Sequence, residues 1–261
     1  MSDAALPEDL AAAMRTLAHQ PQVLICLDFD GCVAELVPDA HLARPVPANA
    51  AAIERLAGLD DGVHLAYVSG RPLEGLRELA SPPEGTLLVG SHGAEKDLGD
   101  GSPSLVLTSA QQRAREDIIR ILEQIAATYE GAWVEHKPAG AAIHVRHIED
   151  LALGESILDE ARSALTIIDG AHQKEGKQIL EAVVVLATKG EAIDELRAEL
   201  APDAVFFAGD DVTDEHGFAV LGQGDVGVKV GPGETRAAYR IPAPESLAEV
   251  LEVFAEARTA G

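Results

Sequence analysis

The sequence predicts an α/β protein in which a Rossmann-like parallel sheet forms the core and an α+β unit is inserted into it. Short apolar runs rich in β-branched residues alternate with helical segments along most of the chain. This alternation is typical of parallel strands that helices cover on both faces. The middle of the chain departs from this pattern, with alternating polar and apolar residues that favour antiparallel hairpins.

The composition narrows the class of protein and its partners. Of the 261 residues, 47% are hydrophobic and 25% are charged, which is typical of a soluble globular chain. The 20 basic residues face 44 acidic ones, so we expect no nucleic-acid partner and no basic membrane-binding surface. A small anionic substrate is compatible with this charge if a local pocket of lysines, arginines and amides binds it. The 2 cysteines make a disulfide framework unexpected.

The location follows from the same features. No apolar stretch approaches the length of a membrane span, and the N-terminal residues lack the basic-then-apolar pattern of a signal peptide. We therefore expect a cytoplasmic protein. Our expectation for the oligomeric state, which these features do not determine, is a monomer.

The elements of the core follow in chain order. The spacing of Leu10, Met14 and Leu17 predicts an amphipathic helix. Helices over 48–59 and 72–79 separate the first apolar runs. The predicted core strands are residues 23–27, 63–68, 86–90, 205–209 and 225–230.

The segment between the third and fourth core strands is the inserted unit. We predict that residues 1–106 and 188–261 form the core and that residues 107–187 form the insertion. A Pro-Ala-Gly turn splits its first pair of strands. In chain order, its predicted elements are a helix over 109–129, strands over 132–138 and 141–148, a helix over about 150–162, and strands over 163–170 and 177–185.

Acidic residues follow two of the core strands. Asp28 and Asp30 lie one residue apart at the tip of a buried strand, where like charges repel and must lose water. Asp210, Asp211 and Asp214 follow the fourth core strand, and strand ends meet at one edge of a parallel sheet. Together these groups could bind a hard cation such as Mg²⁺, which prefers carboxylate and carbonyl oxygens.

The other strand ends supply groups that suit a phosphate. Ser69 with Gly70 follows the second strand, and Lys189 begins a helix; both are suitable donors to phosphate oxygens. An aspartate is also a nucleophile toward phosphoryl groups. Each cluster alone also fits a solvated loop or a capped turn. Their joint occurrence at the strand ends favours a site for phosphoryl transfer.

The motifs resemble those of a known group of enzymes. The set as a whole resembles the haloacid dehalogenase superfamily of phosphatases, and the insertion falls where members with a C2-type cap carry theirs. The closer resemblance, over nearly the whole chain except the first twenty residues, is to the trehalose-6-phosphate phosphatase family. The motifs are DFDG (28–31), SGR (69–71), GSHGAE (90–95), WVEHKPAGAAIHVRH (133–147), GKQILE (176–181), KG (189–190), GDDVTDE (209–215) and VGPGETRAAYRI (230–241).

The resemblance implies catalytic roles for the core residues. Asp28 would attack phosphorus and form an aspartyl-phosphate, and Asp30 would protonate the leaving sugar oxygen and then activate water. Ser69 and Lys189 would hold phosphate oxygens. For Mg²⁺, the implied ligands and supporting residues are Asp28, the main-chain carbonyl of Asp30, Asp210, Asp211 and Asp214.

The resemblance also implies a substrate-binding set and a substrate, trehalose 6-phosphate. Because side chains alternate along a strand, Glu135 and Lys137 should share one face, as should Lys177 and Glu181. A solvated sheet face is the alternative reading of these charges. The full set is Ser69, Gly70, Arg71, His92, Glu135, Lys137, Arg146, Lys177 and Glu181.

The sequence departs from the family pattern in two places. Cys32 stands where the family usually has threonine, and we expect it to replace a structural hydroxyl, not to act as a nucleophile. The stretch after Glu181 lacks the arginine and proline often found there. Alternative functions are a phosphatase for sucrose or mannosylglycerate phosphates, a phosphomutase, and a non-catalytic sugar-phosphate sensor.

Overall fold

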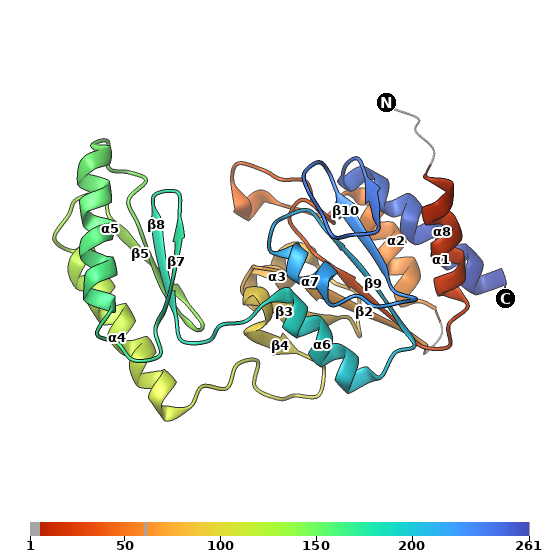
Figure 1. Cartoon of the computed structure of the whole chain (residues 1–261), viewed down its shortest axis with the longest axis horizontal. Coiled ribbons are helices and arrows are strands. Elements are labelled where there is room, and N and C mark those ends of the chain that lie inside the picture. The colour runs from red at the N-terminus through yellow and green to blue at the C-terminus, as the bar shows by residue number, and fades with distance from the viewer. Residues whose placement is uncertain (1–5, 60–61, 261) are drawn as a thin grey trace. The chain divides into compact units, whose positions relative to one another are not determined.

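The structure is a computed structural model that describes residues 6–59 and 62–260. It divides into two compact units, one made of the residues up to Ser102 and from Ala187 onward, the other of Pro103–Leu186 (Figure 1). No helix within the described ranges has the length and hydropathy of a membrane span.

The first unit contains a mostly parallel sheet with strand β1 near its centre. Its order is β11-β10-β9-β1-β2-β3-β4, and only the β3–β4 pair is antiparallel. The five predicted core strands are all present. The strands are β1 (Val23–Leu27), β2 (Val63–Val68), β3 (Leu87–Gly90), β4 (Glu95–Asp97), β9 (Ala204–Gly209), β10 (Val226–Val230) and β11 (Tyr239–Ile241).

Helices cover both faces of this sheet, which is why β1 is apolar at every position. Val23, Ile25 and Leu27 pack into one core cluster with α1, α2, α3 and α8, whereas Leu24 and Cys26 pack into another with α6 and α7. The helices are α1 (Glu8–Ala18), α2 (Pro47–Ala57), α3 (Leu73–Ala80), α6 (Lys189–Leu200), α7 (Asp214–Ala219) and α8 (Leu247–Ala260).

The second unit is an antiparallel sheet with helices on one face (Figure 1). Apolar side chains from α4 and α5 pack with alternate residues of the strands, such as Ile143 and Leu180, to form its core. The predicted fold class, a parallel core with an inserted α+β unit, is confirmed. The elements are α4 (Ser109–Ala126), β5 (Trp133–Lys137), β6 (Gly140–His144), α5 (Leu151–Leu165), β7 (His172–Gly176) and β8 (Ile179–Val183), with sheet order β5-β6-β8-β7.

The prediction of a strand over 163–170 is wrong. Helix α5 continues to Leu165, because Ile157, Ala161 and Leu165 extend one buried helical stripe. The strand that pairs with β8 is instead β7, with the sequence HQKEG. This polar edge strand has no apolar alternation, so the sequence pattern could not reveal it.

Candidate active site

The end of β1 places Asp28 beside a buried lysine. Lys189 Nζ lies 2.7 Å from Asp28 Oδ1 and 2.7 Å from Asp214 Oδ1. All three side chains are buried. Lys189 stands at the start of α6, which Thr188 and Glu191 fix through a capping box. A buried charge needs such partners, because each ion has lost its water.

Burial and neighbouring charge shift the pKa values of these groups. Burial raises the pKa of Asp28; the Lys189 ammonium opposes the rise, and the Asp214 carboxylate adds to it. Burial alone would lower the pKa of Lys189, but the two carboxylates raise it above its ordinary value. The two carboxylates therefore favour the ammonium form of Lys189, which lies against the Asp28 carboxyl.

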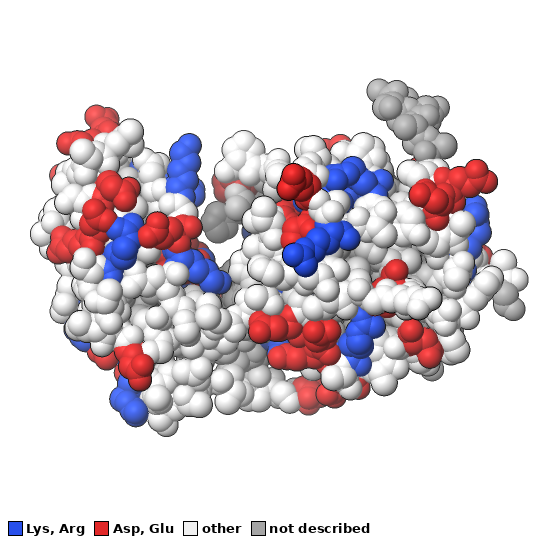
Figure 2. All heavy atoms as spheres, in the orientation of Figure 1, with Lys and Arg blue, Asp and Glu red and all other residues white. Residues whose placement is uncertain are grey.

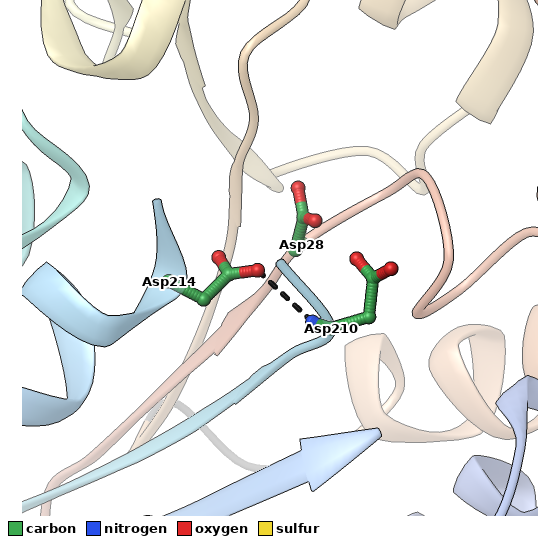
Figure 3. Close-up of side chains that lie close together, drawn as sticks. All are labelled: Asp28, Asp210 and Asp214. Atoms are coloured by element: carbon green, nitrogen blue, oxygen red, sulfur yellow. Dashed lines mark hydrogen bonds between the residues drawn. The ribbon is translucent and has the colours of Figure 1, made fainter. Parts of the chain in front are cut away.

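The carboxylate of Asp210 lies beside those of Asp28 and Asp214 and forms an acidic cluster with them at the ends of β1 and β9 (Figure 3). One oxygen atom each of Asp28, Asp210 and Asp214 lies within 4.8 Å of the others. Asp214 Oδ2 accepts hydrogen bonds from the main-chain N–H groups of Asp210 and Asp211, both at 2.9 Å. Lys189 occupies its other oxygen, so both oxygens of Asp214 have partners within the protein and the side chain holds the loop at Asp210 and Asp211 in place.

Glycines allow the two loops to approach each other. Gly31 has φ +74°, and a Cβ at this position would lie 2.1 Å from Asp210 Oδ2. A Cβ on Gly209 would lie 2.3 Å from the carboxyl carbon of Asp214. Any side chain at either position would therefore push the carboxylates apart.

The acidic cluster has the chemistry of a site for a hard cation. Burial, followed by the charges of Asp214 and Asp211, raises the pKa of Asp210 to about 6. A divalent cation would offset this cost, and oxygen donors are those that Mg²⁺ prefers. Asp211 lies outside the cluster: it is exposed, and its Oδ1 accepts from the N–H of Val212 at 2.7 Å.

The carboxylate of Asp30 is held by Arg71. Arg71 Nε and Nη2 donate to the two carboxylate oxygens, both at 2.6 Å. Nη2 also donates to the carbonyl of Ala40 at 2.8 Å, and the guanidinium lies 5.4 Å from the centre of the Phe29 ring. This two-pronged pairing fixes the orientation of the Asp30 carboxylate.

The loops after β2 and β3 lie against each other. Ser69 is buried, and its Oγ accepts from the N–H of Arg71 at 3.2 Å. His92 N–H donates to the carbonyl of Ser69 at 2.9 Å. A Cβ on Gly70 would lie 2.5 Å from the His92 ring, so the glycine permits this close approach. The SGR and GSHGAE motifs thus form one structural group.

The sequence analysis did not single out two charged residues that are buried in the structure. Lys229, on β10, is buried and donates a hydrogen bond to the carbonyl of Asp210. Glu95 is buried and accepts from Ser91 Oγ at 2.6 Å and from the N–H of Leu73 at 3.3 Å. A lysine within an apolar strand was the available signal for Lys229, because an unpaired buried charge is costly.

Cys32 is fully buried in the core cluster that lies beneath the site. Burial, followed by the charges of Asp28, Asp214 and Asp210, raises the pKa of its thiol well above the ordinary value. A neutral buried thiol is a packing group, because the thiolate is the nucleophilic form.

The second unit brings Glu135, Lys137 and Glu181 together on one sheet face. Lys137 Nζ lies 3.2 Å from Glu181 Oε2 and 3.9 Å from Glu135 Oε1. Glu135 and Glu181 both pair with Ala142 in the strand register, from opposite sides. This is the open face of the sheet, because Val134, between Glu135 and Trp133, packs toward the helices.

The other two polar residues predicted for this unit lie in turns. Arg146 is exposed in the turn after β6, and Lys177 is exposed in the turn between β7 and β8. The prediction that Lys177 shares a strand face with Glu181 is wrong. The strand begins only at Ile179, because the chain turns at Lys177 and Gln178, where Gln178 adopts φ +60°.

Known proteins match this chain in sequence and in fold. It is 34% identical over 258 residues to the bifunctional trehalose-6-phosphate synthase/phosphatase of Thermoproteus tenax, covering 95% of this chain and 33% of that protein. It is 34% identical over 239 residues to the trehalose-6-phosphate phosphatase of Escherichia coli, covering 88% of this chain and 85% of that protein. The chain therefore spans about a third of the first relative and most of the second.

A solved structure shares the fold. The C-terminal domain of the C. albicans trehalose-6-phosphate phosphatase superposes with a TM-score of 0.73 at 20% identity, covering 95% of this chain and 97% of that domain. The model of the trehalose-phosphatase family matches residues 26–244, which include all the motifs described above. The resemblance predicted from those motifs is confirmed, and the chain belongs to the trehalose-phosphatase family.

Proposed function

We propose that this chain is a Mg²⁺-dependent phosphatase that hydrolyses trehalose 6-phosphate to trehalose and phosphate. The observation that carries the proposal is Asp28, a buried carboxylate at the end of the central strand, 2.7 Å from the Lys189 ammonium and beside the carboxylate of Asp210. The names of the Escherichia coli and Thermoproteus tenax relatives supply the substrate.

In the first half-reaction, an oxygen of Asp28 attacks phosphorus and the bond between phosphorus and the sugar oxygen breaks. Asp30 gives its proton to the leaving sugar oxygen, so that the sugar departs as a neutral alcohol. Lys189, and Ser69 with the main chain of Gly70, hold phosphate oxygens and balance their charge. The product of this half-reaction is an aspartyl-phosphate at Asp28.

In the second half-reaction, Asp30 takes a proton from water as the water oxygen attacks phosphorus. The bond between phosphorus and the Asp28 oxygen breaks, which releases phosphate and restores both carboxyl groups. Arg71 orients Asp30 through its two hydrogen bonds in the ionised form, which is the form that takes the proton from water. One of these two bonds must break when Asp30 carries the proton for the first half-reaction, because the protonated oxygen becomes a donor.

The acidic cluster fits a divalent cation. Asp28, the carbonyl of Asp30 and Asp210 would hold Mg²⁺, with Asp211 and Asp214 supporting the loop. When bound, the cation offsets the negative charge of these carboxylates and of the phosphate. The buried Lys229, bonded to the carbonyl of Asp210, keeps that loop in place.

We propose that the second unit, predicted as residues 107–187, is a C2-type cap that recognises the sugar. Glu135, Lys137 and Glu181 present charged hydrogen-bonding groups on one open face, and a disaccharide offers many hydroxyls. Arg146 and Lys177 would reach the substrate from exposed turns, and Arg71 and His92 would border the phosphate.

Phosphate release from a panel of sugar phosphates tests the proposal. The panel contains trehalose 6-phosphate, sucrose 6-phosphate, mannosylglycerate phosphate and glucose 6-phosphate, each with Mg²⁺ and with a chelator. We expect the highest kcat/KM for trehalose 6-phosphate and no release under chelation. Preference for another member would reassign the substrate, and binding without release would indicate a sensor.

A further inference from the structure

Trp133 and His144 form a stacked pair on the open face of the second sheet. Their ring centroids lie 3.8 Å apart and the ring planes differ by 4°. The two residues are direct partners in the β5–β6 register, so the stack lies across the strands. His144 is buried, whereas Trp133 keeps 40% of its surface exposed. Because the imidazole covers one face of the indole, the exposed surface belongs to its other face and its edge.

The stack is continuous with the polar residues of the same face. Glu135 Oε2 lies 2.9 Å from His144 Nε2, and the same carboxylate lies beside Lys137. Trp133, Glu135 and Lys137 alternate along β5 and therefore point to one side of the sheet. Glu135 therefore holds the His144 ring in place, and the His144 ring in turn fixes the plane of the Trp133 indole.

His144 has the properties of a backing group. Burial lowers its pKa, although the hydrogen bond and charge of Glu135 act in the opposite direction. Its Nδ1 is buried without a hydrogen-bond partner within the described part of the chain, so the contacts that orient the ring are the Glu135 bond and the indole. A buried imidazole with this single polar anchor is suited to packing flat against another ring.

An exposed indole beside charged hydrogen-bonding groups matches the two surfaces of a pyranose. A pyranose ring has faces of C–H groups, which carry partial positive charge, and an edge of hydroxyls. Aromatic faces are electron-rich and attract such hydrogens, while carboxylates accept from hydroxyls. In small-molecule sites, apolar and aromatic surface commonly combines with a few polar groups that fix orientation.

We infer that Trp133 is the stacking surface for one glucose ring of the substrate, with His144 as the backing that fixes the indole plane. The inference rests on the proposed function, because it names how the sugar of that substrate is recognised. Glu135 then has two roles: it binds hydroxyls and it holds His144.

The chain contains 1 tryptophan, so its fluorescence reports on this position alone. We would titrate the Asp28→Asn variant, which is expected to bind substrate without turning it over, with trehalose, with trehalose 6-phosphate, and with inorganic phosphate plus Mg²⁺. The two trehalose ligands should give a saturable change in tryptophan emission and should protect the indole from iodide quenching. Phosphate with Mg²⁺ should give neither effect. An equal response to phosphate would assign the signal to a movement of the protein and would overturn the inference.

Substitutions provide the second arm. Trp133→Leu should raise KM for trehalose 6-phosphate by roughly tenfold with a smaller change in kcat, and Trp133→Phe should recover most of the loss. The matched control is Ile167→Ala, an 81% exposed apolar residue of the same unit outside the sheet, which should leave KM unchanged. A KM for Trp133→Leu within twofold of wild type would overturn the inference.

The two arms separate this inference from the proposed function. One possible result is that the wild type releases phosphate from trehalose 6-phosphate, the tryptophan emission of Asp28→Asn does not respond to trehalose, and Trp133→Leu keeps the wild-type KM. This result would reject the stacking role but not the proposed function. A fluorescence response to trehalose in a chain that hydrolyses no sugar phosphate would support the stacking role and reject the enzyme. No fluorescence response to trehalose together with no release of phosphate would reject both the stacking role and the proposed function.

Discussion

At the scale of single residues, the core site depends on one buried lysine that contacts two buried aspartates. Lys189 Nζ lies within hydrogen-bonding distance of the carboxylates of both Asp28 and Asp214. All three side chains are buried, so their charges are compensated mainly by one another. A buried ion pair gives little net stability, but removal of one partner leaves the other charge without compensation. Removal of Lys189 is therefore expected to destabilise the fold as well as the proposed phosphate site.

Lys189→Met should lower the free energy of unfolding by roughly 3–5 kcal/mol, because two buried carboxylates lose their cation. Urea unfolding at pH 7 measures this. The matched control is Lys96→Met, whose salt bridge with Glu195 is at the surface, and its expected cost is below about 1 kcal/mol. Equal effects of the two substitutions would show that the buried cluster is not held by Lys189.

Asp210→Asn should stabilise the metal-free protein at pH 7–8. The pKa of Asp210 is about 6 in the folded state, above its ordinary value of 3.8, so the ionised form carries a folding penalty. The penalty is fully present above pH 6 and disappears as pH falls toward 4, where the folded wild type keeps its proton. After allowance for its partial exposure, the gain is on the order of 1 kcal/mol, or about 2–4 °C in Tm.

Thermal unfolding in chelator at pH 8, 6 and 4.5 measures this difference. The gap in Tm between variant and wild type should narrow as pH falls. Mg²⁺ should then raise the Tm of the wild type but not of Asp210→Asn. A gap that widens toward low pH would mean that the pKa of Asp210 is lowered by folding.

At the scale of elements, the open face of the second sheet carries the sugar-binding prediction. Glu181→Ala should lower kcat/KM for trehalose 6-phosphate by about 10- to 100-fold, because a charged hydrogen bond contributes roughly 1.5–3 kcal/mol. Hydrolysis of a small aryl phosphate should change little, since that substrate has no sugar. Glu135→Ala and Lys137→Ala should show the same selectivity.

The matched control for this prediction is Glu175→Ala. Glu175 belongs to the same sheet but pairs with Arg162 of α5, with its Oε1 2.7 Å from Arg162 Nε. Glu175→Ala should leave kcat/KM unchanged for both trehalose 6-phosphate and the aryl phosphate. If Glu181→Ala lowered kcat/KM for the two substrates equally, the residue would act on the fold, and its proposed role in sugar binding would be withdrawn.

The elements of the core could be predicted from sequence because buried parallel strands are continuous apolar runs. Three of the edge strands could not: β4 and β11 have three residues each, and β7 has no apolar residue. The candidate nucleophile and the acidic loop were visible as charges at strand ends. The Arg71–Asp30 pairing, the bonds of Lys229 and the Trp133–His144 stack were not, because they depend on side-chain contacts between different elements, which the pattern of one segment does not specify.

At the scale of the whole molecule, a chain with a net charge of −24 is proposed to bind an anion. On the face shown in Figure 2, Lys and Arg side chains lie singly or beside acidic residues and do not gather into one patch. The proposed binding of phosphate would therefore depend on local groups: Lys189, the main chain near Ser69 and a bound cation.

Removal of metal should accordingly abolish phosphate release. Without a cation, the phosphate would meet the uncompensated carboxylates of Asp28 and Asp210. Mg²⁺ should restore activity, and Ca²⁺ should restore it poorly, because its larger and looser coordination would misplace nucleophile and phosphate. Phosphate release after exhaustive chelation and after addition of each ion measures this. Full activity in the chelated enzyme would exclude a metal-dependent reaction.

The most direct test of the account is phosphate release from trehalose 6-phosphate, in Mg²⁺, by wild type and by Asp28→Asn. Asparagine can still accept a hydrogen bond from Lys189, so both proteins should fold, with thermal unfolding as the check. The account predicts steady release by the wild type and a loss of about a thousandfold or more in the folded variant, because asparagine cannot form the aspartyl-phosphate. Retention of a tenth of the wild-type turnover by the variant, or no release by the wild type, would contradict it.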